Sequence, residues 1–88
     1  MKAELQLYTR KDCCLCEAMK AILDQVAAKI PFTLQEIDVD VTMELQQQYG
    51  NDVPVLFVNG RKAFKHRWTA QELEKKLKRE RVFPERSD

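Results

Sequence analysis

Three cysteines within four residues carry the reactive chemistry of this chain: Cys13, Cys14 and Cys16. Cys13 and Cys16 form a C-x-x-C pair that follows an apolar run and opens a helical pattern. At the start of a helix, this spacing places one thiol in the exposed first turn and the other within disulfide reach behind it. Because such a pair can cycle between dithiol and disulfide, the spacing predicts thiol redox chemistry.

Cys13 is the predicted nucleophile. Attack on a disulfide needs a thiolate, and a free cysteine, with a pKa of about 8.5, is mostly protonated at neutral pH. A helix N-terminus offers unpaired N–H groups and a partial positive charge, which favour the anion. Arg10 and Lys11 add positive charge nearby, and we expect the helix end and these cations to outweigh the carboxylates of Asp12 and Glu17.

The other two cysteines receive different roles. Cys16, one turn inside the helix, would attack the mixed disulfide formed at Cys13 and release the reduced substrate. Cys14 points about 100° away from its neighbour and does not share its position. It is either a small filler residue or an alternative resolving or modified thiol.

The apolar pattern predicts the elements that must position these thiols. Alternation and apolar runs indicate strands, i, i+3, i+4 spacing indicates helices, and Asn59-Gly60 indicates a hairpin turn. Asp12, Thr42 and Thr69 are predicted helix caps, the last within a capping box. The expected order is strand 4–9, helix 13–29, strand 32–39, helix 42–49, strand 55–58, strand 61–65 and a last helix from 70. This order favours a four-stranded mixed α/β sheet with helices on both faces. Within the 61–65 strand we expect Ala63 and Lys65 on one face and Phe64 on the other.

Length and composition indicate one globular domain over residues 1–88, with its core at about 4–80 and a frayed tail at 81–88. The net charge of +1 argues against nucleic-acid binding, and no apolar run approaches the roughly 20 residues that cross a bilayer. The N-terminus carries no signal-like segment, and the clustered cysteines do not form a secreted disulfide framework. We therefore expect a cytoplasmic monomer with no membrane or nucleic-acid partner.

Val53-Pro54 is the second chemical signal. A proline directly before a buried strand is a candidate cis-proline, while the alternative is an ordinary trans proline that opens an edge strand. If it lies beside the cysteines, Val53 would offer its backbone N–H and C=O to an extended peptide, which is binding by strand addition.

The residues around these two signals resemble those of the glutaredoxins. Residues 8–16 are similar to the family's active-site segment, and residues 52–55 are similar to its cis-proline segment. The C-x-x-C pair, the Val-Pro pair and the Asn-Gly hairpin follow the family's order over about residues 4–80. The resemblance implies a thioredoxin-like, glutaredoxin-type three-layer fold, with a four-stranded mixed sheet flanked by three helices. It also implies thiol–disulfide exchange.

The resemblance also implies the partners and the remaining site residues. The substrate would be a disulfide-containing protein or a glutathione mixed disulfide, and the electron donor would be glutathione or a reductase. Arg10 lies three residues before Cys13, where many glutaredoxins have a lysine, so Arg10, Val53 and Pro54 are the predicted substrate-binding residues. No tightly bound cofactor is expected, and glutathione is a candidate co-substrate.

Residues 64–69 depart from the family. Glutaredoxins carry a Gly-Gly pair and an aspartate there, which hold the carboxylate and amine of glutathione, whereas this chain has neither glycine nor aspartate. Arg67 is a candidate to hold a carboxylate instead, and we group it with Lys11 and Cys14 as accessory residues. His66, the single histidine, is either a surface residue or a proton carrier. Trp68 either packs against the last helix or lines the substrate groove.

Two other classes of function remain open. The three cysteines could bind zinc or an iron–sulfur cluster shared between two chains, although a structural zinc site normally has four ligands in two separated pairs. The block Cys13, Cys14, Cys16 with one distant histidine does not match that pattern, so we assign no metal ligands. A binding module on a thioredoxin-type fold without catalysis is the third class.

Overall fold

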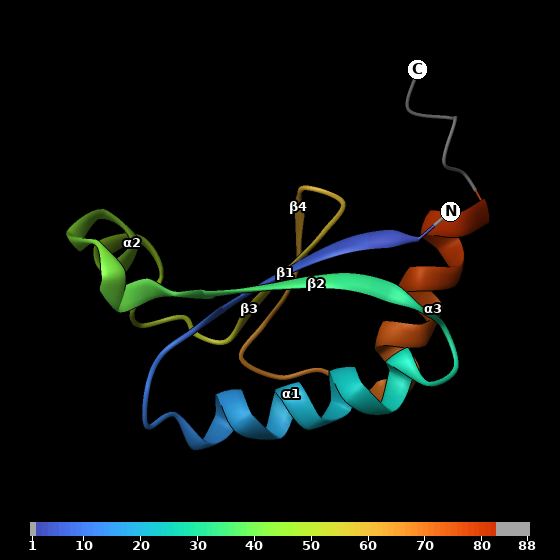
Figure 1. Ribbon diagram of the computed structural model, residues 1–88, viewed down its shortest axis with the longest axis horizontal. Helices are drawn as coiled ribbons and strands as arrows, with labels where there is room; N and C mark the ends of the chain where they lie inside the picture. The colour runs from blue at the N-terminus through green and yellow to red at the C-terminus, as the bar shows by residue number, and fades with distance from the viewer. Residues whose placement is uncertain (1, 83–88) are drawn as a thin grey trace.

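The computed structural model describes residues 2–82, which form a sheet with helices against it (Figure 1). The element order matches the sequence prediction, with one additional short 3-10 helix, η1. The elements are β1 (Ala3–Thr9), α1 (Cys14–Ala27), β2 (Phe32–Asp38), η1 (Val39–Val41), α2 (Met43–Tyr49), β3 (Val55–Val58), β4 (Arg61–Lys65) and α3 (Ala70–Val82).

The four strands form one mixed sheet in the order β2-β1-β3-β4. β1 and β2 are parallel and are connected through α1, while β3 is antiparallel to both β1 and β4. The register places Tyr8 opposite Val55, so the end of β1 and the start of β3 lie at the same edge of the sheet. The segment after β1 and the segment before β3 therefore meet there.

The hydrophobic core lies between one face of the sheet and the two longer helices. Alternation along β1 buries Ala3, Leu5 and Leu7 on this face, as the period of a strand requires. Helices α1 and α3 cover it with apolar side chains three or four residues apart. These are Met19, Leu23 and Val26 from α1 and Leu73 and Leu77 from α3.

The opposite face of the sheet is covered by α2 at one end only. The Tyr49 ring, at the end of α2, lies 4.5 Å from the Tyr8 ring and 6.2 Å from the Phe57 ring, measured between centroids. No residue of α2 is buried: Met43, its first residue, is 73% exposed, and Val41 just before it is 66% exposed. This helix is consequently attached to the sheet by much less apolar surface than α1 or α3.

Helix caps follow the sequence prediction at two of three places. The Thr42 hydroxyl accepts the Leu45 N–H at 3.1 Å, and Thr69 and Glu72 form the reciprocal capping box. The prediction of Asp12 as a cap is wrong, because Asp12 has a φ of 58° and makes the turn before the helix. Cys13 is the N-cap instead, since its sulfur accepts the Cys16 N–H.

Two details of the C-terminal half also differ from the prediction. Helix α3 continues through residues 81 and 82, which were expected to fray, and the rest of that predicted tail, 83–88, lies outside the described residues. A register shift between Leu56 and Phe57 adds one residue to β4. Because of this bulge, Ala63 packs against the core together with Phe64 instead of sharing the face of Lys65.

Candidate functional site

Cys13 and Cys16 are joined by a disulfide at the N-terminus of α1, with their Cα atoms 5.2 Å apart. The two sulfur-bearing residues differ in access. Cys13 is partly exposed at the cap position, whereas Cys16 is only 1% exposed within the first turn. Cys13 is therefore the more accessible of the two residues, and their order of reaction stays a prediction.

Backbone N–H groups of the first helical turn surround the Cys13 sulfur. The Cys16 N–H donates to Cys13 Sγ at 3.1 Å, and the Glu17 N–H donates to the Cys13 carbonyl at 3.1 Å, where α1 begins. The remaining N–H groups of the first helical turn add the positive end of the helix dipole. Reduction of the disulfide would leave a thiol with a hydrogen-bond donor already directed at it.

Cys14 lies outside this pair. It is the first residue of α1, is exposed, and forms no disulfide. The structure therefore does not use it as a filler of the core, while its assignment as an accessory thiol stays a prediction.

The peptide bond between Val53 and Pro54 is cis, as predicted. Pro54 is buried one residue before β3, so it lies beside the end of β1. The Val53 N–H already donates to the Tyr49 carbonyl at 3.1 Å. The Val53 N–H is thus occupied within the chain, and binding of a peptide at Val53 stays a prediction.

Arg10 is in contact with other parts of the chain. Its guanidinium bonds to both carboxylate oxygens of Asp40 at 3.2 Å and to the Gly50 carbonyl at 3.1 Å. These contacts hold the pKa of the Asp40 carboxyl below its usual value, first through the Arg10 hydrogen bond and then through the Gln46 amide. The neighbouring Lys11 is exposed and leaves its charge at the surface.

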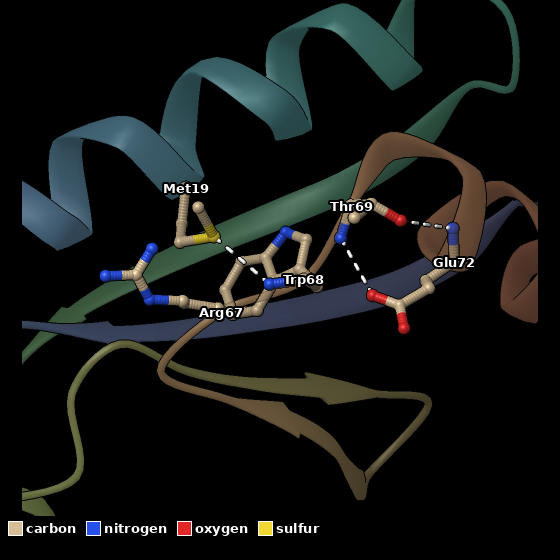
Figure 2. A pocket seen from close by; sticks show the side chains of 5 residues that line it. All are labelled: Met19, Arg67, Trp68, Thr69 and Glu72. Carbon is tan, nitrogen blue, oxygen red and sulfur yellow. Dashed lines mark hydrogen bonds between the residues drawn. The ribbon is translucent and has the colours of Figure 1, made fainter.

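The turn between β4 and α3 borders a cavity of about 230 Å³ (Figure 2). Arg67 lies on one side of it and Glu72 on the other, and the Met19 thioether accepts the Trp68 backbone N–H at 3.3 Å. Trp68 is 3% exposed and packs against Phe64 with ring centroids 5.9 Å apart, so it is a packing residue whose edge also lines the cavity. Its Nε1 has no hydrogen-bond partner among the described residues.

Sequence reasoning missed two residues that contact predicted site residues, Asp40 and Met19. Asp40 pairs with Arg10 across 30 positions, and Met19 reaches Trp68 across 49. Met19 looks like any other apolar position of α1, and Asp40 lies in a polar stretch without periodicity, so neither had a local signal. Within residues 2–82 no group of three or more His, Cys, Asp or Glu side chains is placed to hold a metal ion.

Comparisons with known proteins agree with this geometry. The sequence model of the glutaredoxin-like domain family matches residues 4–78, and the chain belongs to that family. The glutaredoxin-like protein YDR286C homolog of Dictyostelium discoideum is 36% identical over 69 residues. The match covers 72% of this chain and 64% of that relative, so the chain spans less than two thirds of the relative's length.

Solved structures show the same fold. The X-ray structure of target protein XcR50 from X. campestris has 32% sequence identity and a TM-score of 0.73, covering 85% of this chain and 96% of that one. Desulfothioredoxin from Desulfovibrio vulgaris, in its reduced form, has 24% identity and a TM-score of 0.65 over 90% of this chain and 81% of that one. The fold is thus thioredoxin-like, with the four-stranded mixed sheet and three helices that the sequence predicts.

Across 2–82, none of the helices combines the length and the apolar character that a membrane crossing needs.

Proposed function

We propose that this protein is a thiol–disulfide oxidoreductase with Cys13 as nucleophile and Cys16 as resolving thiol. The observation that carries the proposal is the disulfide at the start of α1, in which one sulfur belongs to a partly exposed residue and the other to a buried one. Membership of the glutaredoxin-like family and the cis Val53-Pro54 bond at the same edge of the sheet support it.

The reduced pair would act in two exchange steps. The Cys13 thiolate attacks one sulfur of a substrate disulfide, a bond forms between Cys13 and that sulfur, and the other substrate sulfur leaves as a thiolate that takes a proton. The Cys16 thiolate then attacks Cys13 Sγ and releases the second substrate thiolate. The substrate gains two electrons, and the protein returns to the observed disulfide.

The substrate would be a protein disulfide or a glutathione mixed disulfide, with its extended chain against the Val53 carbonyl and Pro54. Lys11 and Arg67 are two exposed cations that would bind an acidic group of this substrate. Glutathione or a reductase would restore the dithiol, since the protein itself supplies no electrons. We place this activity in the cytoplasm, where the pair would be kept reduced and no tightly bound cofactor is required.

The test is turnover of a small mixed disulfide, with glutathione and then with thioredoxin reductase as electron donor. Wild type should be active with at least one donor, and Cys13→Ser should abolish turnover. Inactivity of wild type with both donors, together with a Cys13 thiol that titrates like a free cysteine, would remove the proposal.

A further inference from the structure

The Arg10 side chain connects two segments that are distant in sequence. Arg10 precedes Cys13 by three residues and lies in the segment between β1 and α1. Its Nε and Nη2 contact the Asp40 carboxylate of η1, the latter at 3.1 Å, and its Nη1 donates to the Gly50 carbonyl at the end of α2. We call these contacts among Arg10, Asp40 and Gly50 the Arg10 bridge.

Both acceptors of the bridge are held in place. The Asp40 N–H donates to the Asp38 carboxylate at 2.9 Å, and the Gln46 side-chain amide donates to Asp40 at 2.9 Å. Gly50 is buried, and a Cβ added there would collide with the Gln46 carbonyl and lie 3.7 Å from Arg10 Nη1. The guanidinium therefore approaches the backbone at a position where the chain leaves little room for a side chain.

The far end of the bridge leads directly into the proline segment. After Gly50 the chain turns, with the Asp52 and Val53 N–H groups both donating to the Tyr49 carbonyl at 2.8 and 3.1 Å, and then reaches Pro54. One side chain thus joins the segment that carries Cys13 to the turn that carries Val53.

Other contacts also hold this part of the molecule: Val39 of η1 is fully buried, and Lys65 Nζ lies 4.0 Å from Asp52 Oδ1. α2 has no buried residue and rests on the sheet through the Tyr49 ring. Where little apolar surface is buried, local opening takes less free energy than global unfolding. To these contacts the bridge adds a direct link between the turn of residues 50–53 and the segment that carries Cys13.

We infer that Arg10 is a positioning residue, whose bridge to Asp40 and Gly50 holds the Val53-Pro54 segment in place beside Cys13. This deepens the proposed function, on which its kinetic consequence rests. A substrate-binding Arg10 would need a free guanidinium, whereas here its Nε and both terminal nitrogens contact protein oxygens. Lysine carries a single ammonium and cannot make the same set of contacts, so Arg10→Lys should not restore the bridge.

The structural part of the test is amide hydrogen exchange, which requires no activity. In Arg10→Gln and in Asp40→Asn, exchange at the Asp52 and Val53 amides should become faster by about three- to tenfold, as expected for loss of a partly exposed charged contact in a region that opens locally. Glu74→Gln is the matched control, because it removes the similar Lys29–Glu74 contact of 3.5 Å and should leave those amides unchanged.

The kinetic part uses the same variants with a disulfide substrate. Arg10→Gln should lower kcat/KM, Asp40→Asn should lower it by a smaller factor because the Arg10–Gly50 hydrogen bond remains, and the double variant should lower it no further than Arg10→Gln does. A substrate-binding role gives a different pattern, in which Asp40→Asn frees the guanidinium and kcat/KM stays at or above wild type.

The two proposals fail in different ways. Unchanged exchange at Asp52 and Val53 in both variants would overturn the positioning role, as would normal kcat/KM in Asp40→Asn alongside a loss in Arg10→Gln. A wild-type protein without thiol–disulfide exchange activity would refute the proposed function instead. The amide hydrogen exchange measurement would still decide whether Arg10 positions the turn.

Discussion

The His66 backbone N–H donates a hydrogen bond to the Pro54 carbonyl at 2.8 Å. This bond extends the pairing of β3 with β4 by one step beyond Val55 and Lys65. It joins the proline segment of the site to the turn before α3. At that point the chain adopts a left-handed conformation, with a φ of 71° at His66.

The His66 conformation predicts an unusual response to substitution. His66→Gly should raise the free energy of unfolding by about 0.5–1 kcal/mol, because glycine adopts positive φ without the Cβ clash. His66→Val should lower it by about 1–2 kcal/mol, since a β-branched residue is poorly tolerated there. Urea denaturation measures both. Arg67→Gly is the control and should destabilise; a loss of stability in His66→Gly of the same size would refute this account.

The different exposure of the two disulfide-bonded residues, Cys13 and Cys16, predicts their order of reaction. After reduction, a small alkylating agent should modify Cys13 well before Cys16, because Cys16 is 1% exposed. Mass spectrometry of peptides after timed quenching measures this order. Equal rates at the two thiols would show that burial does not distinguish them in the reduced protein.

The assigned roles also predict which variant accumulates an intermediate. Cys16→Ser should trap a mixed disulfide between Cys13 and the substrate, because no second thiolate one turn away can release it. The adduct mass of the intact protein is the measurement. Cys13→Ser is the matched control and should give no such adduct, while a Cys16→Ser protein that turns over freely would assign resolution to another thiol, with Cys14 the nearest.

The Arg10 bridge predicts how the site responds to acid. The pKa of Asp40 lies below its usual value of 3.8, chiefly because Arg10 donates to the charged form. A depressed carboxyl pKa contributes stability that is present above the unfolded pKa and is lost as pH falls through the folded one. The bridge should thus persist at neutral pH and weaken only below about pH 3.8. A carbon-13 titration of the Asp40 carboxyl measures this, and in Arg10→Gln its midpoint should move up toward 3.8.

Removing the capping box of α3, which lies far from the thiols, should lower the free energy of unfolding. Thr69→Ala removes the hydroxyl that accepts the Glu72 N–H at 3.0 Å, which should cost about 1 kcal/mol. For a domain of this size the melting temperature should fall by about 4–8 °C. Gln71→Ala, an exposed change in the same turn, is the comparison. A similar fall in melting temperature in both variants would mean that the Thr69 cap stabilises the domain no more than the exposed Gln71 side chain does.

Local sequence signals recovered most of the fold and the thiols. Cys13 and Cys16 lie three positions apart, as do the capping residues Thr42 and Thr69 and the residues whose N–H groups they accept. Pro54 stood out because a proline directly precedes a buried strand. Each of these features is set by short-range geometry, which a sequence pattern contains.

What the sequence did not reveal depends on pairings across the fold. The contact between Arg10 and Asp40 exists because the end of β1 and η1 meet at one edge of the sheet, and no local pattern encodes that distance. The bulge that turns Ala63 toward the core depends on how β4 registers against β3. The cap at Cys13 depends on the left-handed turn at Asp12. Aspartate tolerates this conformation, but its presence in a sequence does not predict it.

The two parts of the site, the thiols at the start of α1 and the segment that leads to Val53, should differ in how well they tolerate substitutions, because α2 is only weakly attached to the sheet. The thiols belong to a helix packed on the core, whereas the approach to Val53 is shaped by α2, which has no buried residue and contacts the sheet through the Tyr49 ring, with the Arg10 guanidinium bonded to the Gly50 carbonyl at its end. We expect substitutions in α2 to be tolerated by the rest of the domain. Relatives could then acquire new substrates by altering α2 while inheriting the same sulfur chemistry.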